Sequence, residues 1–237
     1  MDDITSLSGP APQINSLPDI SIDCLVFGLD NGRLNVLLAQ HRDGIRQGQW
    51  ALPGGHIGAL EDLDNAASRI LQDVTGAQDL FLEQLRAFGR ADRFPGGRVI
   101  TIAYYALVKQ EEYKLAAGGP ASQVKWWDIH DVPELVYDHG EIFAHGLKSL
   151  RHKVRHEPIG FNLLPEKFTL LQLQELYESI LGVSLDKPNF RRKMMNMKLL
   201  FDCNEKQQNV AHRAAALYRF DQSVYSALAE QGFSFEV

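Results

Sequence analysis

This chain of 237 residues has little cysteine, no long apolar run and no excess of positive charge. Its two cysteines, Cys24 and Cys203, lie far apart, so we expect free thiols in a reducing cytoplasm and no disulfide. No apolar run approaches the roughly 18 residues that a membrane-spanning helix needs, so no membrane partner is expected. The acidic start Met1-Asp2-Asp3 is followed by no apolar segment, so we expect no secretory signal.

The net charge of −6 argues against a protein that binds nucleic acid over its whole surface. It is compatible with a local basic patch. Hydrophobic residues make up 45% of the chain, which is enough for a buried core. The length suits one large or two small domains.

A segment from Gly55 to Gly76 has the spacing of a catalytic motif. Residues 50–55 read Trp-Ala-Leu-Pro-Gly-Gly; Glu61 and Arg69 follow at intervals of six and eight positions, and the segment ends in Thr-Gly76. This spacing resembles the Nudix box, which is Gly, five residues, Glu, seven residues, then Arg-Glu-x-x-Glu-Glu-x-Gly. The glycines, Glu61 and Arg69 match that pattern.

The acids of the motif are mostly lost. Its first Glu after the arginine is Ile70 here, and its Glu-Glu pair is Asp73-Val74. Two or three close carboxylates must hold Mg²⁺ to hydrolyse a nucleoside diphosphate, and apolar side chains cannot. We therefore expect no catalytic residue, no metal site and no cofactor. Asp73 is interpreted as an ion-pair partner of Arg69 rather than a ligand, and Glu61 as a helix cap or a second partner of Arg69.

Apolar periodicity predicts an α/β unit before residue 157. Strands are expected at 21–29, 34–39, 98–108 and 124–129, with Asn31-Gly32 as a hairpin turn. Helices are expected at 62–74 and 141–156, the first ended by Gly76. Residues 1–20 are rich in Ser, Pro, Asp and Gly and are predicted to form a flexible arm. A composition break at Glu157-Pro158 divides the rest into domains 21–157 and 158–237.

The second domain has the pattern of a winged helix-turn-helix. Thr169 and Gln172 form a capping box before a helix that Gly182 ends, and a turn leads to a second helix at 189–197. One face of that helix is apolar (Phe190, Met194, Met197), and strands at 199–202 and 215–220 with a polar loop at 203–213 predict a wing.

The opposite face of the second helix is basic and rich in amides. Cations near a helix N-terminus are unfavourable unless an anion such as DNA phosphate compensates. A helix pair that only dimerises is the alternative. The predicted DNA-binding residues are Lys187, Asn189, Arg191, Arg192, Lys193, Asn196, Lys198 and Arg213.

The degenerate box followed by this module resembles the Nudix-related transcriptional regulators of the NrtR family, and within it the Shewanella member. The likeness covers the chain from about Ser21 onward and is carried by residues 93–105, 138–139, 173–182, 189–193 and 217–220. The resemblance implies a Nudix α/β/α sandwich with a mixed sheet, then a C-terminal winged helix-turn-helix. It further implies a homodimeric repressor on a palindromic double-stranded DNA operator near NAD-biosynthesis genes, released by ADP-ribose.

The expected ligand pocket lies around the box. Gly54-Gly55 would let backbone approach a ligand closely, and Trp50 is either a core anchor or a face that stacks on adenine. Four arginines are candidates for diphosphate contact or ordinary solvated charges: Arg42, Arg90, Arg93 and Arg98. The alternative function is a working Mg²⁺-dependent hydrolase of ADP-ribose that takes its carboxylates from Glu111, Glu112 or Asp92 and dimerises through the second domain.

Overall fold

The structure is a computed structural model that describes residues 19–30, 32–208 and 214–237. The predicted arm at 1–20 lies almost entirely outside the described residues, as do Asn31 and Arg213. None of the helices in the described part is long and apolar enough to cross a bilayer.

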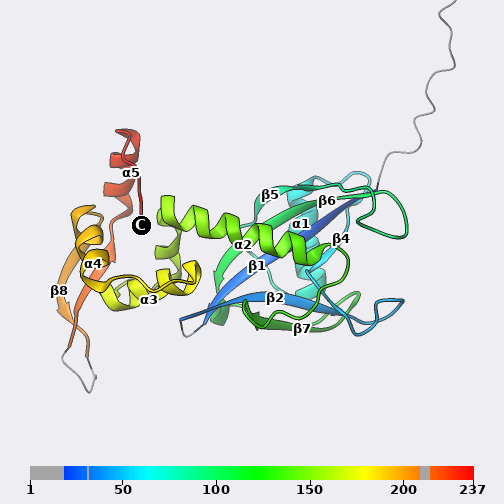
Figure 1. Cartoon of the computed structure of the whole chain (residues 1–237), viewed down its shortest axis with the longest axis horizontal. Coiled ribbons are helices and arrows are strands. Elements are labelled where there is room, and N and C mark those ends of the chain that lie inside the picture. Colours follow the sequence, from blue (N-terminus) through cyan, green and yellow to red (C-terminus); the bar gives the residue numbers. More distant parts are fainter. Residues whose placement is uncertain (1–18, 31, 209–213) are drawn as a thin grey trace, which may run out of the picture.

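The first half is built on a seven-stranded mixed sheet (Figure 1). Strand β1 is central: it pairs in parallel with β6 and antiparallel with β2 and β4. The path of the sheet is β3-β2-β1-β6-β5, with β7 on β2. The strands are β1 (Asp19–Asp30), β2 (Arg33–His41), β3 (Trp50–Ala51), β4 (Gly54–His56), β5 (Glu83–Phe88), β6 (Val99–Lys109) and β7 (Ala121–Asp128).

One helix covers each face of this sheet. Successive side chains of a strand point to opposite faces, and along β1 Cys24 and Val26 join one core cluster whereas Leu25 and Phe27 join another. The first cluster contains α1 (Leu63–Thr75) and the second contains α2 (His139–His156). The predicted α/β/α sandwich with a mixed sheet is therefore confirmed.

Local sequence patterns predicted the bounds of most helices and strands to within a few residues. Gly32 adopts φ +73° in the tight turn between Asp30 and Arg33, and Gly76 ends α1 with φ +74°. β5 was not predicted, since its sequence Glu-Gln-Leu-Arg-Ala-Phe is polar and it lies at the sheet edge. Two short 3₁₀ helices, η1 (Gln110–Glu112) and η2 (Pro158–Leu163), complete the connections.

The second half is a winged helix module. Helix α3 (Leu170–Leu181) has the predicted capping box at Thr169 and ends at Gly182 with φ +69°. Helix α4 (Lys187–Asn196) carries a proline in its first turn and an N-cap at Asp186. The wing strands are β8 (Leu200–Lys206) and β9 (Ala216–Phe220), followed by an unpredicted helix α5 (Gln222–Glu230).

The predicted wing loop at 203–213 was wrong in its first part. β8 continues to Lys206, which pairs with Ala216 across the hairpin. Most side chains of β8 are exposed, so backbone pairing with β9, rather than apolar burial, keeps this polar stretch extended.

Helix α2 runs from the sheet to the second half (Figure 1), and the two halves share one core through it. A single cluster of buried side chains runs from Leu25 on β1, through Leu150 on α2, to Leu173 on α3 and Phe190 on α4. The Arg151 guanidinium at the end of α2 donates from Nε to the Ile180 carbonyl at 3.0 Å. Helix α2 thus belongs structurally to both halves.

Candidate ligand site and DNA-binding face

Arg69 neutralises both remaining acids of the box. Its Nε and Nη2 atoms lie 2.7 Å from the two carboxylate oxygens of Glu61, and its Nη1 lies 3.4 Å from Asp73 Oδ2. Glu61 also accepts the Gly58 N–H at 2.9 Å, whereas Asp62 occupies the N-cap of α1. The arginine contact lowers the pKa of Glu61 from 4.5 to about 2. Of the two roles considered for Glu61, the structure shows the pairing with Arg69.

The apolar replacements in the box are core residues. Ile70 and Val74 are 3% and 4% exposed and belong to the cluster that packs α1 against the sheet. A Cβ atom on Gly55 would lie 3.4 Å from Ile70 Cγ1, which is an ordinary packing distance. At two of the three positions where the Nudix motif has an acid after the arginine, this chain has packed apolar side chains, and Asp73 at the third pairs with Arg69.

The carboxylates proposed for a substitute metal site do not assemble. Asp92 pairs with Arg90 at 2.7 Å, and Glu112 on η1 pairs with Lys109 at 3.5 Å. Within the described ranges, no three His, Cys, Asp or Glu side chains are grouped so that they could hold a metal ion.

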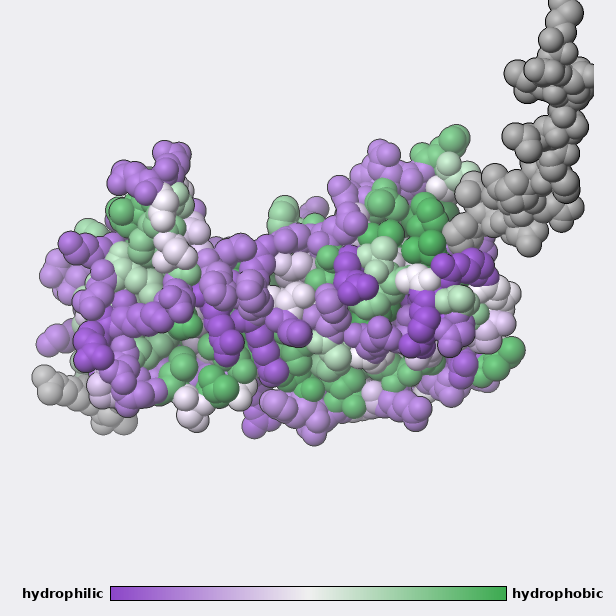
Figure 2. Space-filling view, turned by 45° about the horizontal axis from the view of Figure 1, so that its top comes forward, coloured by the Kyte–Doolittle hydropathy of each residue, from purple (hydrophilic) through white to green (hydrophobic). Residues whose placement is uncertain are grey.

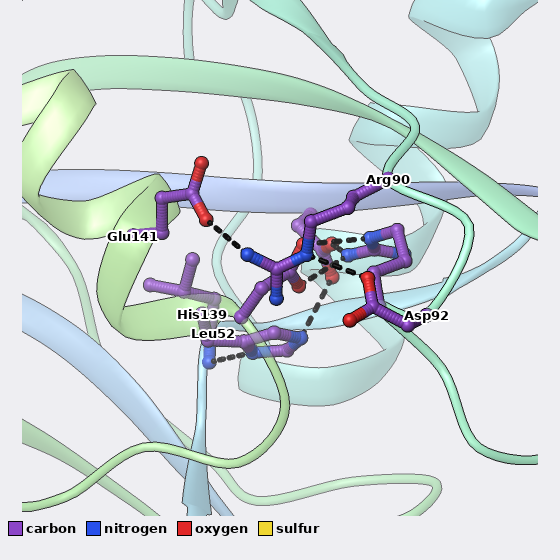
Figure 3. Close-up of polar contacts among 8 residues, drawn as sticks. Leu52, Arg90, Asp92, His139 and Glu141 are labelled. Atoms are coloured by element: carbon purple, nitrogen blue, oxygen red, sulfur yellow. Dashed lines mark hydrogen bonds and ion pairs between the residues drawn. The ribbon is translucent and has the colours of Figure 1, made fainter.

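A buried ion-pair network lies at one end of the sheet (Figure 3). Arg93 is 6% exposed, and its Nε and Nη2 each donate to Asp138 at 2.8 Å in a bidentate pair. Nη2 also lies 3.4 Å from Asp23 Oδ2 on β1. Asp138 is the N-cap residue of α2, but its carboxylate accepts no hydrogen bond from the backbone of that helix. It accepts from Arg93 instead.

His139 extends the network to the loop before the box. The Leu52 N–H donates to its Nδ1 at 3.0 Å, which places the ring proton on Nε2, 3.6 Å from Asp23 Oδ1. A Cβ atom on Gly54 would lie 2.3 Å from the same Asp23 oxygen. The close approach predicted at Gly54 is therefore made by the Asp23 carboxylate, which occupies the space a Cβ atom would need.

The other arginines proposed for the diphosphate lie in different places. Arg42 Nη2 donates to the Ala121 carbonyl at 2.8 Å, which ties the end of β2 to β7. Arg90 is exposed and reaches Glu141 in the first turn of α2 at 3.4 Å (Figure 3). Arg98 is exposed and lies beside Gly89. Arg93 lies below the surface, and both it and Arg90 are already paired with two carboxylates.

Trp50 fits the role of a core anchor. It is half-buried, and its ring makes an edge contact with Trp127 at 5.2 Å between centroids.

Asp23 was missed by sequence reasoning, although a lone acid inside an apolar strand run is a usable signal of a buried ion pair.

Helix α4 presents the predicted polar face. Phe190 and Met194 are buried, while the predicted DNA-binding side chains within the described residues are exposed apart from Arg191, which is half-buried. Arg192 Nη2 donates to Asn189 Oδ1 at 2.5 Å, so the two side chains form one surface unit. The exposed members are Lys187, Asn189, Arg192, Lys193, Asn196 and, after the helix, Lys198.

Comparisons with known families match both halves. Residues 18–146 match the NUDIX domain, and residues 160–220 match the NrtR DNA-binding winged helix domain. A protein of Acinetobacter baylyi described as the ADPR responsive transcriptional repressor NtrR is 32% identical over 222 residues, which is 92% of this chain and 86% of the relative. An ADP-ribose pyrophosphatase of Methanocaldococcus jannaschii is 30% identical over 125 residues, covering 53% of this chain and 70% of that protein.

Two solved structures are similar. Shewanella oneidensis NrtR complexed with a 27mer DNA superposes with a TM-score of 0.71 at 28% identity, covering 91% of this chain and 97% of that one. The NUDIX domain of the same protein complexed with ADP ribose gives 0.53 at 29% identity, covering 59% and 93%. At 28% identity the likeness to this Shewanella protein holds at the level of the family.

Asp138→Asn should destabilise the fold by about 3 kcal/mol, because it leaves the buried Arg93 with only the longer contact to Asp23. Urea unfolding measures this change. Asp92→Asn is the matched control: its carboxylate pairs with an exposed arginine, so a loss below about 0.5 kcal/mol is expected. Equal losses for both variants would contradict the assignment of Arg93 as the central ion pair.

Arg69→Met should return the pKa of Glu61 from about 2 toward its ordinary 4.5. Because the folded-state pKa is lowered, the Glu61 carboxylate stabilises the fold above pH 4.5, and that stabilisation fades as the pH falls toward 2. An NMR titration of the side-chain carboxyl reads the midpoint directly. Arg33→Met, at the start of β2, should leave the midpoint unchanged.

Proposed function

Since this chain belongs to the NrtR family of Nudix-related transcriptional regulators, we propose that it is a repressor whose winged module binds an operator and whose Nudix half senses ADP-ribose. The exposed polar face of α4 is the observation that carries the proposal. Its Acinetobacter relative is described as ADPR responsive, and the related Shewanella structures hold DNA and ADP ribose. The regulated genes would be those of NAD biosynthesis and salvage.

The side-chain contacts of the residues in the Nudix box favour ligand sensing over hydrolysis. Glu61 and Asp73 are held by Arg69, and Ile70 and Val74 are packed in the core. Glu61 would have to release a bidentate arginine before it could bind Mg²⁺. A site of this kind keeps a nucleoside diphosphate intact, so the signal persists for as long as the metabolite does.

Helix α4 would enter the major groove. Arginine pairs with guanine edges and asparagine with adenine edges, so the Asn189–Arg192 unit suits base recognition. Lys187 begins the helix and Lys198 follows it, and both suit phosphate contacts. A homodimer would place two such helices one turn of DNA apart, which corresponds to a palindromic operator.

We propose functional boundaries close to the composition break. Residues 21–157 would form the sensor, 158–237 the DNA-binding domain, and 1–20 an arm. The shared core through α2 means that the boundary separates roles rather than independently packed units. A repressor that acts on chromosomal DNA would work in the cytoplasm.

ADP-ribose should weaken operator binding by roughly 5- to 150-fold at saturation, the usual range of allosteric coupling. Fluorescence anisotropy with DNA from the chain's own upstream region measures this, with ribose 5-phosphate as the control ligand. A ligand that binds both states equally shifts nothing, so unchanged DNA affinity at saturating ADP-ribose would refute induction while leaving DNA binding intact.

The same preparation discriminates the alternative function. The archaeal pyrophosphatase shares the Nudix half, so a Mg²⁺-dependent hydrolase remains the competing assignment. Turnover of ADP-ribose above ~1 s⁻¹ in the presence of Mg²⁺ would establish the enzyme and overturn the sensor.

Arg192→Ala and Asn189→Ala should each cost about 1–3 kcal/mol of operator binding and relax preference at one base pair. Lys198→Ala should weaken binding to all sequences and reduce the salt slope by about one. Lys114→Ala, an exposed lysine of the Nudix half, is the control. Wild-type affinity in all three α4-region variants would mean that another element reads the DNA.

A further inference from the structure

Met195 is an apolar side chain on the polar face of α4. It is 44% exposed and belongs to neither core cluster, although the preceding Met194 is 2% exposed and packs in the core. Successive residues of an α-helix lie about 100° apart around its axis, so the face that buries Phe190 and Met194 leaves Met195 outside. Within the described part of the chain, packing gives no reason for a large apolar residue at this position.

Met195 lies next to the two side chains that suit base recognition. Residues three apart are neighbours on a helix surface, and Met195 is three residues after Arg192, which is three residues after Asn189. Arg192 Nη2 donates to Asn189 Oδ1 at 2.5 Å, so the first two members of this row are already joined. The row thus runs along the exposed side of α4 and has its apolar member in the last turn.

The helix ends directly after this row. The Lys198 N–H donates to the Met195 carbonyl at 3.2 Å, and Lys198 has φ +57°, a left-handed conformation that stops the helix from continuing. The 10 residues of α4 make a rod about 15 Å long, close to the width of the major groove of DNA, which is about 12 Å. A helix this short brings its last turn, and with it Met195, into the groove that the first turn enters.

The major groove offers one apolar group for such a side chain. The groups that distinguish base pairs there are hydrogen-bond donors and acceptors, with the single exception of the thymine 5-methyl group. Methionine is flexible and polarisable and has no hydrogen to donate, so it adapts to an apolar contact of irregular shape. We propose that Met195 is a specificity-determining residue that covers the methyl group of one thymine, beside the base pair read by Asn189 and Arg192.

This inference rests on the proposed function, because it requires α4 to lie in the groove of an operator. Uracil substitution isolates the contact, since uracil lacks only the methyl group of thymine and keeps its hydrogen-bonding groups. Each thymine of the operator in the chain's own upstream region is replaced in turn, and the affinity is measured by fluorescence anisotropy. For wild type, replacement at one thymine of a half-site should weaken binding roughly fourfold, which corresponds to one buried methyl group.

Met195→Gln keeps the length of the side chain but ends in an amide. The uracil replacement that weakens wild type should leave the affinity of this variant unchanged, whereas Met195→Leu should retain the loss because it keeps an apolar surface. Ile45→Ala removes an apolar side chain that is 99% exposed in the Nudix half, and it should respond to uracil as wild type does. Since Met195 is exposed, all its variants should keep the thermal midpoint of wild type.

The two hypotheses fail in different ways. If no thymine distinguishes wild type from Met195→Gln, because each uracil replacement changes the affinity of both proteins equally, the methyl contact is overturned while DNA binding stands. If wild type binds none of the upstream DNA, both the contact and the proposed function are overturned.

Discussion

The buried contact of Arg93 with Asp138 and Asp23 is the constraint on which the sensor half depends. Three ionised groups below 10% exposure are expensive to desolvate, and such a set persists only with close geometry and full hydrogen bonding. The bidentate pair joins the loop before β6 to the N-cap of α2, and Asp23 anchors both to the central strand. Glycine at position 54 and the imidazole of His139 complete the surroundings of that carboxylate.

Local interactions were the predictable part of this molecule. Thr169, Gln172 and Gly182 mark α3 because a cap and a terminating glycine depend on neighbours within one helical turn. The replacements at Ile70 and Val74 were likewise visible in the motif, and their burial follows from the helical period of α1. The fold class followed from these elements together with the family resemblance.

Contacts between distant segments were not predictable. Arg93 meets partners 70 and 45 positions away, and nothing near it in the sequence distinguishes it from Arg90, which is exposed. β5 and the end of β8 were not predicted, because they are strands through pairing with a neighbouring strand and carry no apolar pattern. Tyr137 adopts a left-handed φ of +53°, which has no signal in the sequence because tertiary hydrogen bonds impose it.

Helix α2 physically connects the ion-pair network to the winged module, in addition to contributing side chains to the core. Its 18 residues make a rod about 27 Å long, with Asp138 and His139 at one end and the Arg151 contact to α3 near the other. The last residue of the chain also holds this end, since the Val237 N–H donates to the Arg155 carbonyl at 3.0 Å. A rotation of about ten degrees about the first turn would carry the last turn roughly 5 Å sideways, about one helical pitch. Because one end of α2 carries the ion-pair network and the other contacts α3, a tilt of this helix would move the winged module relative to the sheet.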